Sequence, residues 1–134
     1  MAFESFPQYD LDFSANADLT SSGTVNPQFC ACKLTSTGVA FATAAGNILG
    51  IMQDKGASAS GRATSVRTVN GTISKALADA GGSGWTAGDN LEVYGTVGGL
   101  QTITTGGAKI VAMGIETTTA GNYGAVILKQ GQSA

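Results

Sequence analysis

The sequence predicts a mainly β fold in which two pseudo-repeated lobes form a small barrel or sandwich, preceded by an extended N-terminal arm. Three observations favour this fold class. Short apolar runs recur along the chain, turn residues separate them at intervals of about 8–12 residues, and much of the sequence repeats itself once. With 134 residues, of which 43% are hydrophobic, the chain is long enough to bury a core of its own.

The first 23 residues form the expected arm, because their composition differs from that of the remaining chain. Four of the nine aromatic residues and four carboxylates lie here, and no Lys or Arg precedes Lys33. These residues are Phe3, Phe6, Tyr9, Phe13, Glu4, Asp10, Asp12 and Asp18. Aromatic side chains left in water would promote association, so they should pack against something. Two interpretations stay open: an arm that lies on a partner through Phe3, Phe6, Tyr9, Asp10, Asp12 and Phe13, or an edge strand packed on this chain's own core.

Residues 24–134 are expected to form one β-domain that contains the internal repeat. Apolar positions in the two halves match at an offset of 62 residues, which becomes 60 after a two-residue deletion. The matches are 48–54 with 110–116 and Ala31 with Val93 at the first offset, and Val66 with Val126 at the second. The predicted repeat units therefore run over about 24–71 and 86–131.

Individual strands follow from periodicity and from turn residues. Alternating side chains predict strands over 29–34 and 91–94, and short continuous apolar runs bounded by turns predict buried strands. These runs are 48–52, 110–115 and 125–128. Asn70-Gly71 predicts a two-residue hairpin between the apolar runs on either side, because both residues tolerate positive φ. The single helix candidate is 73–80, where we favour a strand at the start and one helical turn near Ala78.

The two cysteines, Cys30 and Cys32, form a Cys-x-Cys pair. In a strand both would point to the same face, so they could not easily bridge each other. Two interpretations stay open: small buried hydrophobic residues in a reduced compartment, or thiols placed for an intersubunit disulfide. Two cysteines without histidine cannot make a zinc site, so we expect no metal and no cofactor.

Motifs for catalysis are incomplete, and we expect no enzymatic activity. The chain has no histidine, which excludes a Ser-His-Asp triad and a Cys-His dyad. Ser83 lies in a Gly-rich stretch that resembles a nucleophile elbow, but the closing glycine is Trp85. Carboxylate pairs for glycoside hydrolysis, Asp54 with Glu116 or Asp89 with Glu92, have a simpler interpretation as solvated loop residues.

The overall charge and the Gly-rich composition point to protein partners. The net charge is −2, which argues against nucleic acid and anionic lipid as partners, and only 12% of residues are charged, about half the usual share. Short, nearly uncharged side chains can lie flush against another protein with little desolvation or entropy cost. This composition is typical of a component of an assembly.

Residues 24–131 resemble the small head-decoration (capsid cement) proteins of tailed bacteriophages. The stretches that carry the resemblance are 34–39, 44–51, 85–91, 112–116 and 124–128, which read as a strand, a turn, a small-residue run and a hydrophobic-Gly-hydrophobic strand, twice. The resemblance implies a non-enzymatic virion protein, made in the host cytoplasm. It would bind the major capsid protein on the outer shell, commonly as a homotrimer at three-fold positions, and clamp neighbouring capsomers together.

A different class of function remains as the alternative: a carbohydrate- or receptor-binding β-module of a fibre or a secreted adhesin. Such a site requires an exposed aromatic ring beside amide and carboxylate groups, and the single cluster of this kind is Trp85, Asp89 and Asn90. The competing interpretation of Trp85 is a side chain that fills a core or an interface.

Overall fold

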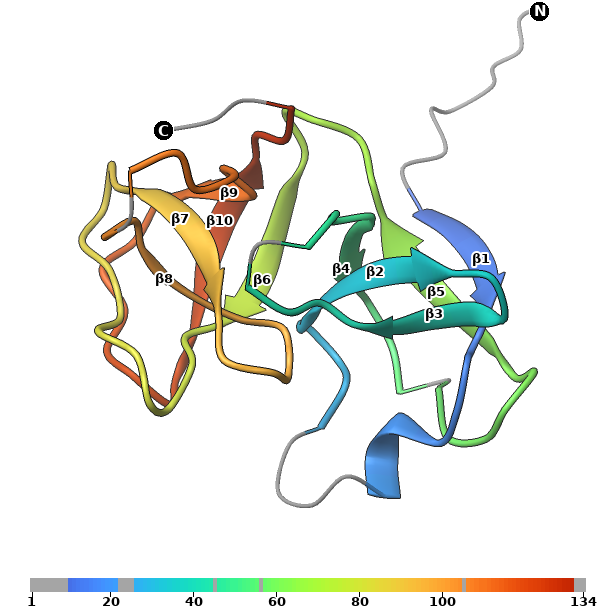
Figure 1. Cartoon of the computed structure of the whole chain (residues 1–134). Coiled ribbons are helices and arrows are strands. Elements are labelled where there is room, and N and C mark those ends of the chain that lie inside the picture. The colour runs from blue at the N-terminus through green and yellow to red at the C-terminus, as the bar shows by residue number, and fades with distance from the viewer. Residues whose placement is uncertain (1–9, 22–25, 45, 56, 105, 132–134) are drawn as a thin grey trace, which may run out of the picture.

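Two five-stranded antiparallel sheets pack as a sandwich in the computed structural model, which describes residues 10–21, 26–44, 46–55, 57–104 and 106–131 (Figure 1). The first sheet contains β1 (Asp10–Ser14), β2 (Ala31–Thr35), β3 (Gly38–Phe41), β4 (Gly50–Met52) and β5 (Ala63–Arg67). The second contains β6 (Ile73–Leu77), β7 (Asn90–Tyr94), β8 (Gly99–Thr102), β9 (Ala112–Gly114) and β10 (Tyr123–Leu128). The predicted fold class is confirmed as a sandwich, because the sheets are not closed into a barrel.

The two lobes have the same topology. The strand order is β1-β5-β4-β2-β3 in the first sheet and β6-β10-β9-β7-β8 in the second, so each strand corresponds to the one five places later. In each lobe the residue after the first strand also forms a parallel bridge to the third strand, Ala15 to Val39 and Ala78 to Leu100. The duplication is therefore complete at the level of the fold, and the first lobe lies on the right of Figure 1 and the second on the left.

The register of the paired strands shows which residues are equivalent. Ile51 of β4 corresponds to Met113 of β9, in agreement with the predicted offset of 62, and Val66 of β5 corresponds to Val126 of β10, in agreement with the offset of 60. For β2 and β7 the prediction was wrong by three residues. Two residues separate β2 from β3 whereas four separate β7 from β8, so the longer turn of the second lobe accounts for two of these three residues.

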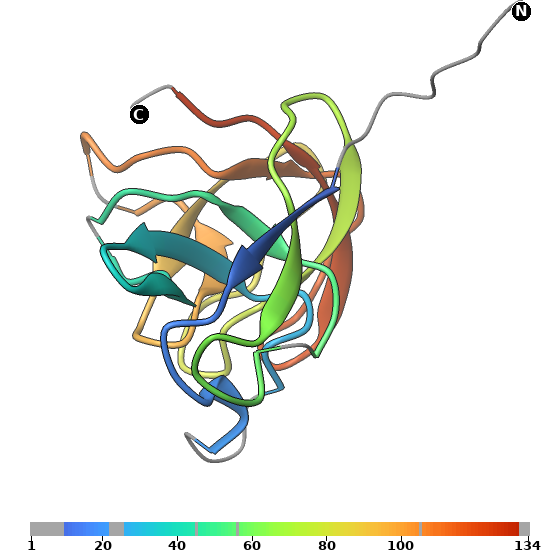
Figure 2. The ribbon, with the colours of Figure 1, turned by 90° about the vertical axis from the view of Figure 1, so that its right-hand side faces the viewer.

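The strand β1 belongs to the N-terminal segment, for which the sequence left two interpretations open. Asp10–Ser14 pairs antiparallel with β5 at the edge of the first sheet (Figure 2). The Phe13 side chain packs against the core of that lobe. This places Asp10–Ser14 within the β-domain, as the edge strand that was the second interpretation of the segment. The equivalent strand in the second lobe is β6, so each repeat unit begins earlier than the sequence predicts.

The predicted hairpin at Asn70-Gly71 is absent, because β5 and β6 belong to different sheets. This turn connects the lobes instead. The Asn70 Nδ2 donates to the Gln130 carbonyl at 2.9 Å, and the Gln130 amide donates to Asn70 Oδ1 at 2.8 Å. Asn70 and Gln130 are equivalent positions, as are Asn47 and Lys109, whose side chains also bond at 2.8 Å. Contacts between equivalent positions are the signature of a two-fold axis, here a pseudo-two-fold axis within one chain.

The two lobes share their core. One buried cluster consists mainly of second-lobe residues but includes Ala31, Ala42 and Ile51 of the first lobe, and the other includes Leu77 of β6. The turn before β8 penetrates this junction. Gly98 donates to the Ala42 carbonyl and accepts from the Ala31 amide, and a Cβ at Gly98 would overlap the Ala31 carbonyl oxygen. Only glycine therefore allows the lobes to approach this closely.

Candidate functional site

In the described part of the N-terminal segment, the Asp10 carboxylate pairs with Arg67 of the same chain. Arg67 Nε donates to Asp10 Oδ1 at 2.8 Å and Arg67 Nη2 to Oδ2 at 3.1 Å, while Nη1 donates to the Ile73 carbonyl at 2.6 Å. In this structure Asp10 joins β1 to β5 and, through Arg67, to the second lobe. The expected role of Asp10 in binding a partner stays a prediction.

The other predicted arm residues divide into three groups. Asp12 is exposed on β1, and Phe13 is partly buried against the first lobe's own core. Phe3, Phe6 and Tyr9 lie outside the described residues. Leu11, which the sequence did not single out, has 43% of its surface exposed on the same edge strand. Among the described residues of this segment, Asp12 and Leu11 thus offer a charged and an apolar group to a partner.

Both cysteine thiols lie inside the first lobe. Cys30 and Cys32 are fully buried and free, and the Cys30 Sγ–H donates to the Asn26 carbonyl at 3.3 Å. Burial raises the pKa of Cys30 to about 12, with a further contribution from Asp79, and burial likewise raises the pKa of Cys32 to about 12. The intersubunit-disulfide interpretation is not supported, because neither sulfur reaches the surface of the folded lobe. The interpretation as small buried residues agrees with the structure.

The carboxylates proposed for glycoside hydrolysis hold equivalent backbone positions in the two lobes. Asp54 accepts from the Ser65 amide at 3.3 Å and from the Thr64 hydroxyl at 2.9 Å. Glu116 accepts from the Ala125 amide at 2.7 Å. Ser65 and Ala125 are equivalent residues of β5 and β10, so each acid satisfies the same N–H of its lobe. This shared hydrogen bond gives both carboxylates a structural role.

In the cluster suggested for carbohydrate binding the aromatic ring is buried, whereas Asp89 and Asn90 are half-buried. Trp85 is only 4% exposed, its Nε1–H donates to the Glu116 carbonyl at 2.8 Å, and its ring lies against Gly114. Asp89 accepts from the Thr86 amide at 2.9 Å and from the Thr102 hydroxyl at 2.7 Å, and these bonds, the first most strongly, lower the pKa of its carboxyl. The indole therefore fills the core of the second lobe and does not present a face on which a sugar could stack.

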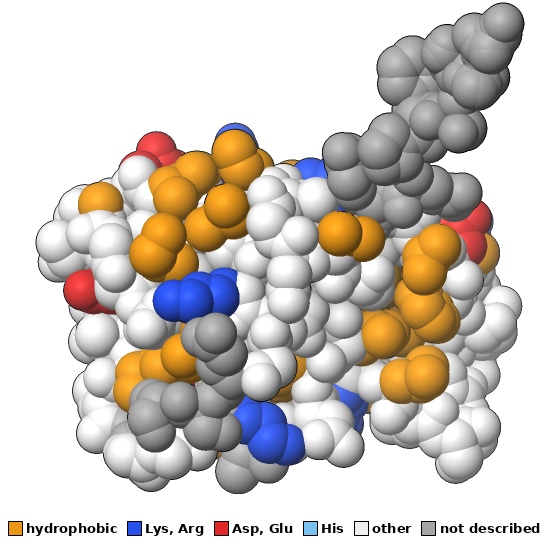
Figure 3. Space-filling model, turned by 90° about the horizontal axis from the view of Figure 1, so that it is seen from above, with side chains coloured by type: hydrophobic (Ala, Val, Ile, Leu, Met, Phe, Trp, Pro, Cys, Tyr) orange, Lys and Arg blue, Asp and Glu red, His pale blue; other side chains and the backbone are white. Residues whose placement is uncertain are grey.

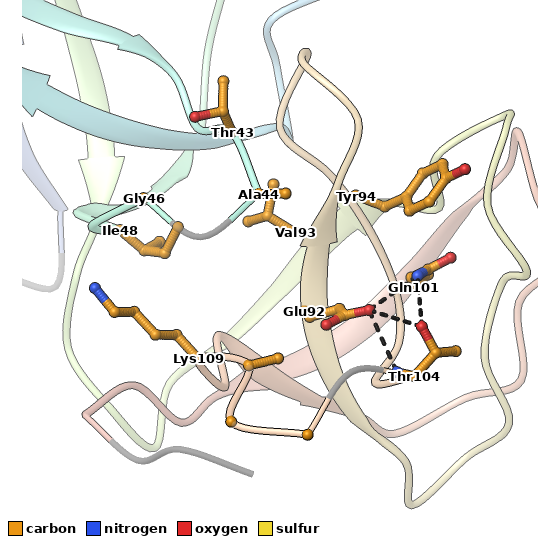
Figure 4. Close-up of a pocket in the computed structure, with 13 residues that line it drawn as sticks. Thr43, Ala44, Gly46, Ile48, Glu92, Val93, Tyr94, Gln101, Thr104 and Lys109 are labelled. Carbon is orange, nitrogen blue, oxygen red and sulfur yellow. Dashed lines mark hydrogen bonds between the residues drawn. The ribbon is translucent and has the colours of Figure 1, made fainter.

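A pocket of about 410 Å³ opens between the lobes (Figure 4). It is lined by the 43–48 loop of the first lobe, by β7 and β8, and by the 104–109 loop of the second lobe. The two loops occupy equivalent places in the repeat, so the pocket lies close to the pseudo-two-fold axis. Its buried polar side chains are Glu92, 8% exposed, and Gln101, 5% exposed. Glu92 and Asp89 bond to different residues, so they do not form the carboxylate pair that was considered.

Large apolar side chains are exposed on both lobes. Seven of them, between 40% and 57% exposed, are Leu11, Leu34, Val69, Ile73, Tyr94, Ile115 and Tyr123. Viewed from above, apolar side chains gather in separate groups, with Lys or Arg side chains beside some of them (Figure 3). Periodicity did not identify these residues as a surface, because an apolar residue in a short strand is equally typical of the core.

Nothing in the described ranges suggests a metal centre or a spanning helix. No group of three or more His, Cys, Asp or Glu side chains there could hold a metal ion, and none of the helical structure there has the length and hydropathy needed to cross a bilayer. Ser83, considered as a nucleophile, donates its hydroxyl hydrogen to the Gly84 carbonyl at 3.2 Å.

Comparisons with protein-family models, curated proteins and solved structures find no match to the chain.

Proposed function

We propose that this chain is a structural virion protein, without enzymatic activity, that binds the outer capsid surface of a tailed bacteriophage. It stabilises the shell by bridging neighbouring capsomers as a homotrimer. The observation that carries the proposal is the set of exposed apolar side chains distributed over both lobes of a charge-poor protein. Exposed apolar groups gathered in patches are typical of surfaces that other proteins cover.

The distribution of these groups suits a protein that touches more than one neighbour. Leu11 and Leu34 belong to the first lobe, whereas Ile115 and Tyr123 belong to the second. A single small ligand could not contact all four. Several weak contacts on separate neighbours combine through effective concentration, and trimerisation multiplies them again. Weak individual contacts are therefore compatible with stable attachment to a lattice.

The residues considered for other functions make contacts within the fold. Asp54 and Glu116, considered for hydrolysis, each accept from a backbone amide, and Trp85, considered for carbohydrate binding, fills a core. These contacts account for each of the three residues without a substrate or a sugar. The edge strand β1 and the aromatic residues that precede it then become the best candidates for attachment, with Phe3, Phe6 and Tyr9 as anchors.

The proposal is tested by co-sedimentation with capsids of a tailed bacteriophage whose genome encodes this chain. Procapsids and expanded capsids are incubated with purified protein and pelleted. The protein is expected to pellet with expanded capsids at a fixed copy number. Failure to pellet with either form would overturn the proposal.

A matched pair of variants tests the anchors separately. Replacing Phe3, Phe6 and Tyr9 together by alanine should weaken binding at least tenfold, whereas Glu4→Gln, a change in the same segment, should have a smaller effect. Undiminished binding by the triple variant would remove this segment from the mechanism and leave the lobes as the binding surface.

A further inference from the structure

The pocket between the lobes contains a carboxylate that the fold uses only in part. Glu92 lies on β7, a strand flanked by β8 and β9. Its Oε1 accepts three hydrogen bonds: from Gln101 Nε2 at 2.9 Å, from the Thr104 amide at 3.3 Å and from the Thr104 hydroxyl at 3.2 Å. These donors fix the orientation of the whole carboxylate.

The second oxygen, Oε2, faces the pocket. It has no hydrogen-bond partner among the described residues, and no buried side-chain oxygen in those residues is left unsatisfied. Oε2 must therefore be reached by solvent, although Glu92 as a whole is only 8% exposed. Figure 4 shows the bonded oxygen directed at Gln101 and Thr104 and the other turned away from them.

No cation within the described residues neutralises this carboxylate. The basic side chain that lines the pocket is Lys109, and its Nζ donates to Asn47 Oδ1 at 2.8 Å on the opposite loop. Burying a carboxylate without a counter-charge is costly. A glutamine at this position could accept the same three hydrogen bonds at lower cost, so the fold itself does not need the charge, and the charge suits a ligand that carries a positive group.

The remaining lining indicates the shape of that ligand. Ala44, Ile48, Val93 and Ala108 make much of the wall apolar. A Lys or Arg side chain combines an apolar stem with a cationic head, and it can pack the stem on an apolar wall while the head meets a carboxylate. We propose that the pocket receives a basic side chain of a partner protein, with Glu92 Oε2 as the acceptor for its ammonium or guanidinium group.

The test uses side-chain probes and needs no capsid, so its failure is distinguishable from failure of the proposed function. Nα-acetyl-arginine amide and Nα-acetyl-lysine amide are titrated into the isotope-labelled protein, and the backbone amide shifts of Thr104, Gly106 and Gly107 are followed by NMR. We expect saturable shifts with at least one of the two probes. The neutral isostere Nα-acetyl-citrulline amide should bind at least tenfold more weakly than the arginine probe.

Two variants that each remove one negative charge distinguish binding to the pocket carboxylate from a general effect of net charge. Glu92→Gln keeps an oxygen for the three donors but places an amide group in the pocket, and it should weaken the cationic probe at least tenfold. Glu116→Gln removes the same charge outside the pocket while keeping an acceptor for the Ala125 amide, and it should leave binding unchanged. The spectra report directly whether each variant is folded.

A variant at the pocket rim keeps the inference testable even if Glu92→Gln does not fold. Lys109 is exposed, so Lys109→Gln should preserve the fold, and loss of a neighbouring positive charge should strengthen probe binding about twofold. Absence of saturable shifts with both cationic probes, equal binding of the citrulline probe, or equal weakening by Glu116→Gln would each overturn the inference.

Discussion

The second lobe contains a tight contact whose energetic consequence can be worked out from its geometry. Gly114 lies on β9, the strand between β10 and β7, and the indole of Trp85 lies directly against it. A Cβ at Gly114 would stand 2.7 Å from Trp85 Nε1, well inside van der Waals contact. In the first lobe the equivalent strand position is Met52 and the equivalent turn position is Asn26. The two lobes therefore place the larger side chain on different elements.

Gly114→Ala should destabilise the protein because neither partner can move away. The strand is held on both sides, and Trp85 is held by its bond to the Glu116 carbonyl at 2.8 Å and by two backbone bonds to Thr118 at 2.9 Å. Overpacking costs about 1–3 kcal/mol, and disturbing the indole hydrogen bond costs about 1 kcal/mol more. We expect a loss of about 2–4 kcal/mol in the free energy of unfolding.

The same change should be harmless once the ring is removed. Trp85→Ala alone should cost about 3–5 kcal/mol through the cavity that it leaves. In that background Gly114→Ala meets no clash, and it gains about 0.5–1 kcal/mol because alanine loses less entropy than glycine on folding. The double-mutant cycle, measured by urea denaturation, should therefore give a coupling energy of about 2.5–5 kcal/mol. Equal costs of Gly114→Ala in the two backgrounds would refute the reasoning.

Three further predictions concern the residues whose roles the structure changed. Asp54→Ala should lower the free energy of unfolding by about 1–2 kcal/mol through the lost bonds to β5, whereas Asp54→Asn should cost less; equal urea midpoints for wild type and Asp54→Ala would contradict this role. Deletion of residues 2–9 should leave the melting temperature nearly unchanged, whereas deletion of 2–14 removes an edge strand and should lower it by several degrees; equal melting temperatures would place β1 outside the fold. Cys30 and Cys32 should resist a thiol reagent until urea unfolds the protein, and rapid labelling of the native state would show that they are accessible. Because folding raises their pKa from 9.0 to about 12, stability should fall as the pH rises from about 9 towards 12.

The sequence predicted the fold class. It also predicted the repeat correctly for those strands whose apolar residues are spaced alike in both halves. The strands β4 and β9 and the strands β5 and β10 align at the expected offsets, because their buried residues retain the same pattern. The first strands, β1 and β6, share no such pattern: β1 carries Asp10 and Asp12, whereas β6 begins at Ile73. Their equivalence comes from hydrogen-bonded pairing alone, which no local pattern records.

Other features depend on contacts between distant parts of the chain. Asn70-Gly71 has the residues of a hairpin turn, yet Asn70 bonds to Gln130, and this contact directs the chain into the second lobe. The sequence named Glu92 only as a possible partner of Asp89 and did not predict its pocket, because the surroundings of Glu92 come from β8 and from a loop of each lobe. The backbone conformation of Phe29 also depends on a distant part of the chain. Phe29, with a φ of 69°, occupies the turn position that Gly88 occupies in the second lobe, and its ring packs edge-on against Tyr123 at 5.9 Å.

The central claim is that this protein strengthens a shell by bridging its subunits, and the stability of the shell itself is the most direct measure of it. Genome-filled capsids that lack the protein are heated with and without it, and release of DNA is followed with an intercalating dye. Bridging predicts that saturating protein raises the temperature of release by several degrees, and that Phe3→Ala/Phe6→Ala/Tyr9→Ala raises it less. An unchanged release temperature with protein bound at full occupancy would contradict the claim.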